Sequence, residues 1–200
     1  MIWSDPIARV AHAGFDLVHT FDAHVASREP GLERLADGGA LGILIGNTRA
    51  LWPVFREALR DPALAAEPHP LDRYTERAID AAFAGARIAY AHRRYGDTFL
   101  PFQRLAVVTG LGALSPSQLV IHPVYGPWFA LRAIVVVEGT PPRRLPIAQP
   151  CRCEAACTDA FARALATADP RDWVAVREAC TVSAQRYSAE QIDYHYGRMC

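Results

Sequence analysis

The stretch SQLVIHPVYGPWFALR, residues 117–132, places a turn between two apolar segments and decides the fold. Apolar and β-branched side chains dominate residues 118–121 and 128–137, a composition typical of strands. Between them, residues 122–127 contain two prolines and a glycine, which favour a turn. We therefore predict a hairpin-like pair of strands within an antiparallel sheet.

Apolar periodicity upstream of this stretch predicts further elements. Residues 41–45 form a short apolar run typical of a buried strand. Apolar residues then recur at helical spacing over 50–59, where Pro53 falls in the first turn. The same reasoning predicts helices over 71–83 and 102–110, and a strand over 87–91.

The chain downstream of the central stretch is predicted to be helical. Residues 138–150 are rich in proline and read as an extended connector, and residues 158–200 as a helical C-terminal part. Asp169 and Pro170 begin one helix as an acidic N-cap and a first-position proline. Ser188 begins another through a capping box. Together the elements predict one α+β domain over residues 1–200, with a central antiparallel sheet flanked by helices.

Composition excludes several function classes. The chain has 21 basic residues, all arginine, and 21 acidic residues. Balanced charge gives no electrostatic footprint for nucleic acid or for an anionic membrane. The apolar runs are too short to span a bilayer, and no basic segment precedes an apolar block at the N-terminus. Five cysteines, an odd number, do not form a disulfide framework, so we expect a cytoplasmic protein.

Three of the cysteines lie close together, at Cys151, Cys153 and Cys157. Thiolates at such spacing could bind zinc or an iron–sulfur cluster. The segment lacks the paired CxxC knuckles of zinc sites and the four-cysteine pattern of ferredoxins. Structural thiols are the simpler interpretation, and we assign no metal site, although the metal alternative stays open.

The central turn is also the candidate functional site. His122, Tyr125 and Trp128 surround it, and aromatic rings give a large flat ligand broad contact at low entropic cost. Arg132 interrupts an apolar strand, and its charge needs an anionic partner because a guanidinium does not deprotonate. The alternative is an ordinary hairpin in which the aromatics are core, His122 is structural, and Arg132 pairs with a structural carboxylate.

Residues 121–132 resemble a segment of the cobalamin-processing, CblC-type family, which includes the methylmalonic aciduria and homocystinuria type C protein. Residues 107–129 also have a local likeness to epoxyqueuosine reductase, another corrinoid protein. The segment between residues 70 and 122 is shorter than in the animal members of the first family. Further stretches resemble that family in the same order along the chain: residues 14–21, 41–52, 70–72, 171–179 and 185–191.

The resemblance implies a flavin reductase or nitroreductase-like fold that binds cobalamin base-off and removes its upper axial ligand. Removal would proceed by reductive decyanation, by glutathione-dependent dealkylation, or by both. It implies that Arg132 and Arg177 hold the carboxylates of glutathione, with Arg198 as the third such arginine. The residues expected to contact the cofactor are Ser117, Ile121, His122, Pro123, Tyr125, Gly126, Trp128, Phe129 and Tyr187.

Two other function classes stay open. The chain could be a flavin-dependent, nitroreductase-like oxidoreductase that binds no corrinoid, or a B12 carrier without catalysis. The expected partners are small molecules: a corrinoid, a thiol such as glutathione, and FMN or FAD as a source of electrons. We expect no nucleic-acid or membrane partner, and a homodimer is left open.

Overall fold

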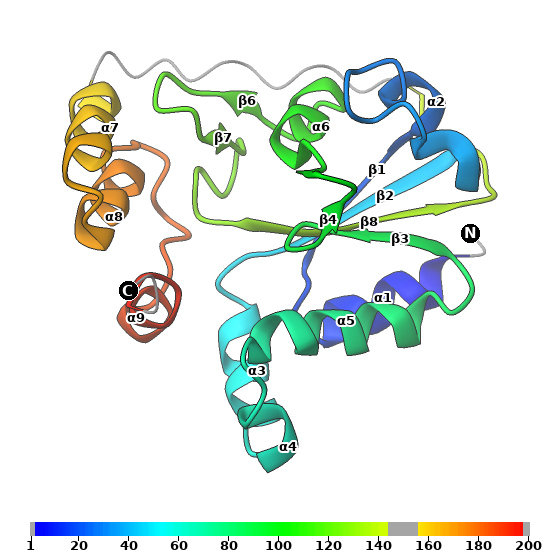
Figure 1. Cartoon of the computed structure of the whole chain (residues 1–200), viewed down its shortest axis with the longest axis horizontal. Coiled ribbons are helices and arrows are strands. Elements are labelled where there is room, and N and C mark those ends of the chain that lie inside the picture. The colour runs from blue at the N-terminus through cyan, green and yellow to red at the C-terminus, as the bar shows by residue number, and fades with distance from the viewer. Residues whose placement is uncertain (1–2, 144–155, 198–200) are drawn as a thin grey trace.

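A computed structural model of the chain, which describes residues 3–143 and 156–197, contains a central four-stranded antiparallel sheet (Figure 1). Its strands lie in the order β1 (Leu17–Asp22), β2 (Leu41–Asn47), β8 (Ala130–Val137) and β3 (Arg87–Tyr90). The predicted α+β fold with an antiparallel sheet flanked by helices is confirmed. Two smaller sheets pair β4 (Arg94–Tyr95) with β5 (Thr98–Phe99), and β6 (Ala113–Leu114) with β7 (Val120–Ile121).

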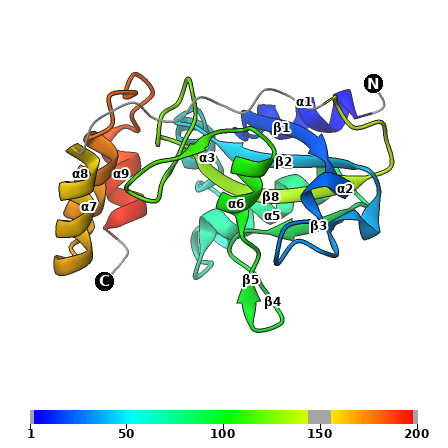
Figure 2. The ribbon, with the colours of Figure 1, turned by 90° about the horizontal axis from the view of Figure 1, so that it is seen from above.

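Helices cover both faces of the central sheet, and three more lie beside it. In Figure 1, α1 and α5 lie below the sheet and α2 and α6 above it. Helices α7, α8 and α9 gather at one side, and Figure 2 shows the β4–β5 hairpin projecting from the body. None of the described helices has the length and hydropathy needed to cross a bilayer. The helices are α1 (Ser4–His12), α2 (Ala23–Ala26), the 3₁₀ helix η1 (Leu35–Gly38), α3 (Leu51–Ala58), α4 (Pro62–Ala65), α5 (Pro70–Ala82), α6 (Phe102–Val108), α7 (Ala156–Thr167), α8 (Pro170–Glu178) and α9 (Ala189–Tyr196).

Strand β2 is buried along its whole length because its edges and faces are all covered. β1 and β8 pair with its two edges, and hydrophobic clusters lie on both of its faces. This double coverage explains the continuous apolar run, where a half-exposed strand would alternate. Gly42 is required in β2 because the ring of Phe21 on β1 covers it, and a Cβ at that position would overlap the ring.

A β-bulge sets Arg132 apart from the regular ladder of β8. Its neighbours Leu131 and Ala133 pair with the consecutive residues Gly46 and Ile45 of β2, so Arg132 is the extra residue. Gly46 permits this geometry, since a Cβ there would lie 2.5 Å from a backbone oxygen of β8. A bulge breaks the two-residue alternation of a strand and re-aims the extra side chain. The bulge therefore determines where the Arg132 guanidinium lies.

The hairpin predicted within residues 117–132 is wrong. β7 covers only Val120–Ile121 and pairs with β6, whereas β8 begins at Ala130 and pairs with β2 and β3. The turn closes on itself instead, because the backbones of His122 and Gly126 exchange hydrogen bonds of 2.9 and 2.8 Å. Both edges of β8 are occupied by β2 and β3, so β7 has no edge of β8 to join.

The connector predicted at residues 138–150 is described only in part. Residues 138–143 form neither helix nor strand, as expected, and residues 144–150 lie outside the described part of the chain.

We expect Gly42→Val to lower the free energy of unfolding by about 1–3 kcal/mol, since overpacking forces neighbours off their rotamers. The added side chain would displace the Phe21 ring. Urea denaturation of the variant and the wild type measures the loss. The control is Phe21→Leu alone and combined with Gly42→Val: a smaller loss in the Phe21→Leu background supports the contact, and strict additivity contradicts it.

Candidate functional site

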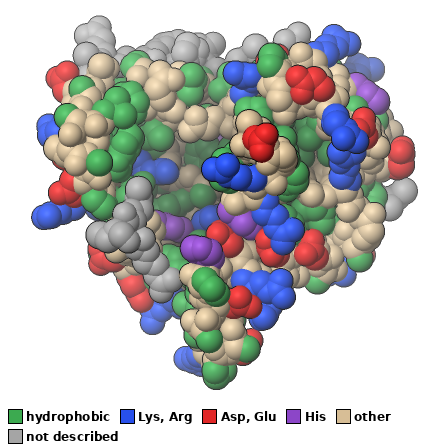
Figure 3. Space-filling view, in the orientation of Figure 1, with side chains coloured by type: hydrophobic (Ala, Val, Ile, Leu, Met, Phe, Trp, Pro, Cys, Tyr) green, Lys and Arg blue, Asp and Glu red, His purple; other side chains and the backbone are tan. Residues whose placement is uncertain are grey.

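The front of the molecule is hollowed between the C-terminal helices and the body that carries the sheet (Figure 3). A cavity of about 240 Å³ lies there between α6, β7, the start of β8, and α8. A second cavity of about 530 Å³ shares Phe102 and Gln103 with it and extends along α6 to Leu114. The first cavity is lined by Phe102, Gln103, Leu119, Val120, Pro127, Phe129, Ala130, Leu131 and Arg177, so most of its wall is apolar.

Arg177 reaches this cavity from α8 and links three parts of the fold. Its Nε donates to the hydroxyl of Tyr196 on α9 at 2.5 Å. Its Nη1 donates to the carbonyl oxygen of Pro127, and its guanidinium lies 5.9 Å from the ring centre of Trp128. Within the described residues no carboxylate forms an ion pair with Arg177. The described contacts of its guanidinium are therefore all with neutral groups.

Arg132 is held in the same way at the bulge. Its Nε donates to Oδ1 of the fully buried Asn47 at 2.7 Å, and Asn47 Nδ2 donates to the carbonyl oxygen of Thr48 at 3.0 Å. Thr48 in turn donates to Asp16 through its backbone N–H at 2.8 Å and its hydroxyl at 2.5 Å. No described carboxylate pairs with Arg132 itself, so the alternative of a structural carboxylate partner is not observed in residues 3–143 and 156–197.

Four side chains around α9 form a polar cluster, the α9 cluster, defined here as Trp128, Tyr187, Gln191 and His195. All have buried polar atoms without a hydrogen-bond partner in the described part of the chain. These atoms are Trp128 Nε1, the Tyr187 hydroxyl, Gln191 Nε2 and Oε1, and His195 Nε2. A buried polar atom without a partner costs about 1–3 kcal/mol, so such atoms are rare and cluster at functional sites. The cluster has the donors and acceptors to bind a polar ligand.

Burial and the charges of the two arginines together shift the pKa values in the α9 cluster. Burial raises the pKa of Tyr187 to about 12, although the charges of Arg177 and Arg132 oppose the rise. Burial, together with the same two charges, lowers the pKa of His195 to about 3. Burial also lowers the pKa of Arg132, which still stays charged at neutral pH. At pH 7 the site is therefore two cations surrounded by neutral polar side chains.

The turn at residues 122–126 is fixed by its own backbone. Nδ1 of His122 accepts the N–H groups of Val124 and Tyr125 at 3.1 and 3.3 Å, which places the imidazole proton on Nε2. Its ring stacks on Tyr125 with centres 4.5 Å apart. Burial, and then the nearby His19, lower the pKa of His122. Gly126 has φ 57°, and a Cβ there would overlap the carbonyl oxygen of Val182. His122 thus helps to shape the turn, and its contact with a cofactor stays a prediction.

The structure brings only part of the predicted contact set together. Phe129 lines the cavity, whereas Trp128 and Tyr187 belong to the α9 cluster. Tyr125 lines a different pocket, of about 670 Å³, with Arg49 and Arg186. Among the others, Ser117 and Ile121 are buried in and beside β7, Gly126 is buried in the turn, Pro123 is exposed, and Arg198 lies outside the described residues.

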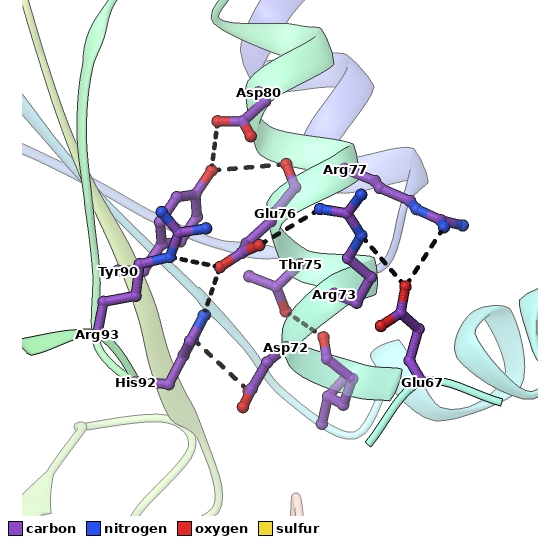
Figure 4. A network of polar contacts seen from close by, with 11 residues as sticks. Glu67, Asp72, Arg73, Thr75, Glu76, Arg77, Asp80, Tyr90, His92 and Arg93 are labelled. Atoms are coloured by element: carbon purple, nitrogen blue, oxygen red, sulfur yellow. Dashed lines mark hydrogen bonds and ion pairs between the residues drawn. The ribbon is translucent and has the colours of Figure 1, made fainter. Parts of the chain in front are cut away.

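A second polar network, around Glu76, lies beside the bulged strand (Figure 4). The Glu76 carboxylate accepts from Arg93 Nε at 2.7 Å and lies 2.9 Å from His92 Nε2. Although burial opposes them, these bonds hold the pKa of Glu76 below its usual range. The other imidazole nitrogen lies 3.6 Å from Asp72. The network fixes the chain after β3, where the Ala91 N–H donates to the Arg132 carbonyl oxygen at 2.9 Å.

The metal hypothesis for the cysteines stays a prediction. Cys157 is buried on α7, while Cys151 and Cys153 lie outside the described residues. Over residues 3–143 and 156–197, no group of three or more histidine, cysteine, aspartate or glutamate side chains is arranged to hold a metal ion.

Sequence reasoning missed three residues that the site uses: Asn47, Gln191 and His195. Asn47 was visible only as the polar residue that ends a buried apolar strand. Gln191 is the last residue of the capping box that begins at Ser188, and the Ser188 Oγ accepts its backbone N–H at 3.2 Å. Its side chain faces inward with His195, one turn along the same helix face, and this i, i+4 pairing of polar residues was the available signal.

The fold matches that of CblC from C. elegans, a B12-trafficking protein and a homologue of human MMACHC. The TM-score is 0.68 at 16% sequence identity, over 98% of this chain and 92% of that one. Epoxyqueuosine reductases from Bacillus subtilis and Streptococcus thermophilus are less similar, with TM-scores of 0.47 and 0.44 and identities of 16% and 15%. The matches cover 90% and 92% of this chain but 54% and 56% of those enzymes. No protein-family model and no curated protein sequence matches the chain. The CblC-type resemblance found in the sequence is confirmed at the level of the fold.

We expect the free energy of unfolding to fall as the pH is lowered from 7 to 5. Burial lowers the pKa of His19, His122 and His195 in the folded chain, so below about 6.5 the unfolded chain binds more protons. The contribution of these histidines to the free energy of unfolding is complete above about pH 6.5. It is lost as the pH falls toward their pKa values in the folded chain, and the pKa of His195 there is about 3. One fully engaged histidine gives a slope of about 1.4 kcal/mol per pH unit.

Urea denaturation at a series of pH values measures this slope. The control is His195→Gln, which removes one depressed histidine and should give a shallower loss between pH 7 and 5. An identical slope in the two proteins would show that His195 does not titrate as its burial requires.

Proposed function

We propose that this chain binds cobalamin base-off in the front hollow and removes its upper axial ligand. The observation that carries the proposal is the pair Arg132 and Arg177. Neither arginine has a carboxylate partner in the described residues. The charges of both lower the pKa values of Tyr187 and His195, whose buried polar atoms have no described hydrogen-bond partner. The fold shared with a B12-trafficking protein supports a corrinoid as the substrate class.

The apolar cavity wall supports a corrin ring at this position. Leu131 of the central sheet and Val120 of the β6–β7 sheet present apolar surface together with Phe129, and Gln103 and Arg177 are polar residues of the lining. Ligand sites of this kind are mostly apolar with a few placed polar groups. In the proposal the wall packs against the macrocycle, and polar residues at the edge bind its amide side chains.

The α9 cluster and the two arginines would bind the thiol that accepts the upper ligand. A carboxylate bonded to a guanidinium contributes about 1.5–3 kcal/mol. Arg132 and Arg177 would each orient one carboxylate of glutathione, and Arg198 is retained as the third arginine of the proposal. For an alkyl ligand, the thiolate sulfur attacks the carbon bound to cobalt. A carbon–sulfur bond forms, and the electron pair of the cobalt–carbon bond stays on the metal.

For a cyano ligand, the proposal requires an external reductant. A reduced flavin, FMN or FAD, would diffuse in and reduce the cobalt, and cyanide would leave as the anion. This step follows from the flavin reductase or nitroreductase-like fold that the family resemblance implies. The chain's own part would be to hold the substrate base-off and to limit solvent at the upper face. The expected partners are therefore small molecules that meet in one hollow.

Visible absorption spectroscopy tests the proposal directly. Adding the chain to cyanocobalamin or methylcobalamin should shift the spectrum to the base-off form, and glutathione should then convert methylcobalamin over time. A base-off shift without conversion by glutathione or by reduced flavin would indicate a carrier. A bound yellow chromophore with no corrinoid shift would favour a flavin enzyme, and either result would contradict the proposal.

Arg132→Gln should slow glutathione-dependent dealkylation roughly 10- to 100-fold, the loss expected for one charge-assisted hydrogen bond. The base-off shift with cobalamin should stay, because Arg132 does not line the apolar cavity. The same absorption assay at saturating and limiting glutathione measures both effects. Loss of corrinoid binding and of dealkylation together would argue against the assigned role. Arg60→Gln is the matched control, because Arg60 is exposed and pairs with Glu57 away from the cavities.

A further inference from the structure

Asn47 occupies the position where a half-buried arginine would ordinarily have a carboxylate. Asn47 is the last residue of β2 and is fully buried. Its Oδ1 accepts a hydrogen bond from Arg132 Nε at 2.7 Å. Aspartate has nearly the same shape and would bind a guanidinium more strongly. A buried charge is ordinarily paired, because an unpaired one is costly. With a neutral amide at this position, Arg132 has no carboxylate ion-pair partner within residues 3–143 and 156–197.

The two hydrogen bonds of Asn47 fix which way its amide points. Oδ1 faces the Arg132 donor, and Nδ2 donates to the Thr48 carbonyl oxygen at 3.0 Å. A flipped amide would set donor against donor and oxygen against oxygen. Asn47 thus uses one end to hold the guanidinium and the other to anchor itself to the backbone. It positions Arg132 without neutralising it.

Among the described residues, the other groups near Arg132 form no ion pair with it, although the charge of Asp72 acts on it. Tyr187 and His195 are both neutral at pH 7, since burial moves their pKa values away from neutrality. Among the carboxylates that act on the site, Asp72 is 3.6 Å from His92, and Asp16 accepts two hydrogen bonds from Thr48. Both acids are engaged by other residues.

We propose that Asn47 is a specificity-determining positioning residue, which holds Arg132 at the bulge while reserving its charge for a carboxylate of the thiol co-substrate. The inference rests on the proposed function and narrows it. A thiol that carries a carboxylate is selected over a neutral thiol, because only a carboxylate can form an ion pair with the Arg132 guanidinium. An aspartate at position 47 would satisfy Arg132 internally and remove that selection.

The test compares Asn47→Asp with Asn47→Ala, using glutathione and the neutral thiol 2-mercaptoethanol with methylcobalamin. Asn47→Asp should raise the KM for glutathione roughly tenfold or more, as expected when an internal carboxylate competes for one guanidinium. With 2-mercaptoethanol its kcat/KM should change less than about twofold, since no carboxylate is involved. Calorimetric titration of glutathione into the cobalamin-loaded protein should show the same loss of affinity.

The order of the two variants separates a charge effect from a merely structural one. Asn47→Ala removes the hydrogen bond to Arg132 but adds no carboxylate that competes for its charge. It should therefore raise the KM for glutathione less than the nearly isosteric Asn47→Asp. Equal losses in both variants, or equal losses with both thiols, would overturn the inference.

Asp72→Asn gives a second measurement that does not depend on the folding of Asn47→Asp. It removes a negative charge that acts on Arg132 and should lower the KM for glutathione roughly twofold, with no change for 2-mercaptoethanol. A raised KM for glutathione would contradict the inference. If wild-type protein gives no base-off shift, the proposed function itself fails, whereas a shift with unchanged variants overturns only the role of Asn47.

Discussion

A guanidinium held at a β-bulge by a neutral amide is the constraint on which the rest of the site depends. Arg132 is the extra residue of β8, and the bulge exists because Gly46 lets the two backbones approach closely. Arginine stays charged under all ordinary conditions, so burial cannot be relieved by losing a proton. Everything packed around Arg132 has to accommodate a fixed positive charge next to the core of the sheet.

The C-terminal helices accommodate this charge and complete the site. α9 is anchored to α3 through Glu190, whose Oε2 accepts from Trp52 Nε1 at 2.9 Å and from Arg56 at 3.0 Å. α8 brings a second cation, Arg177, bonded to the backbone just before β8 and to Tyr196 of α9. The site is therefore an interface between the sheet and α8–α9, and neither part contains it alone.

The sequence predicted the elements whose pattern is local. The strand at 41–45, the helices at 50–59, 71–83 and 102–110 and the strand at 87–91 all appear within a few residues of the expected bounds. Apolar periodicity reports which face of one segment is buried, and that is sufficient for these elements. The edge strand β1 and helix α1 were not predicted, because their burial depends on partners distant in the sequence.

Strand pairing and hydrogen-bond partners could not be predicted from local patterns for the same reason. The hairpin prediction failed because both edges of β8 were taken by β2 and β3, strands that lie 40 or more residues upstream. The bulge at Arg132 depends on a register shift between two such strands. Asn47 acquires its role only when β2 and β8 meet, so its partnership with Arg132 cannot be read from any one window of the sequence. Arg132 and Arg177 were singled out through the family resemblance, and Arg132 also because a charge in an apolar strand demands an anion.

The site has two halves, the apolar cavity and the α9 cluster, which suit different ligands. Arg177 lines the cavity and contacts Trp128 of the α9 cluster. The cavity beside Phe129 offers apolar area, which rewards size and shape but little else. The α9 cluster offers donors and acceptors that each gain about 1–3 kcal/mol when paired, beside two positive charges. A wholly apolar ligand would leave the polar atoms of the α9 cluster without partners. A wholly anionic ligand would gain nothing from the apolar cavity. An apolar surface and a polar, positively charged one therefore lie next to each other, and Arg177 contacts both.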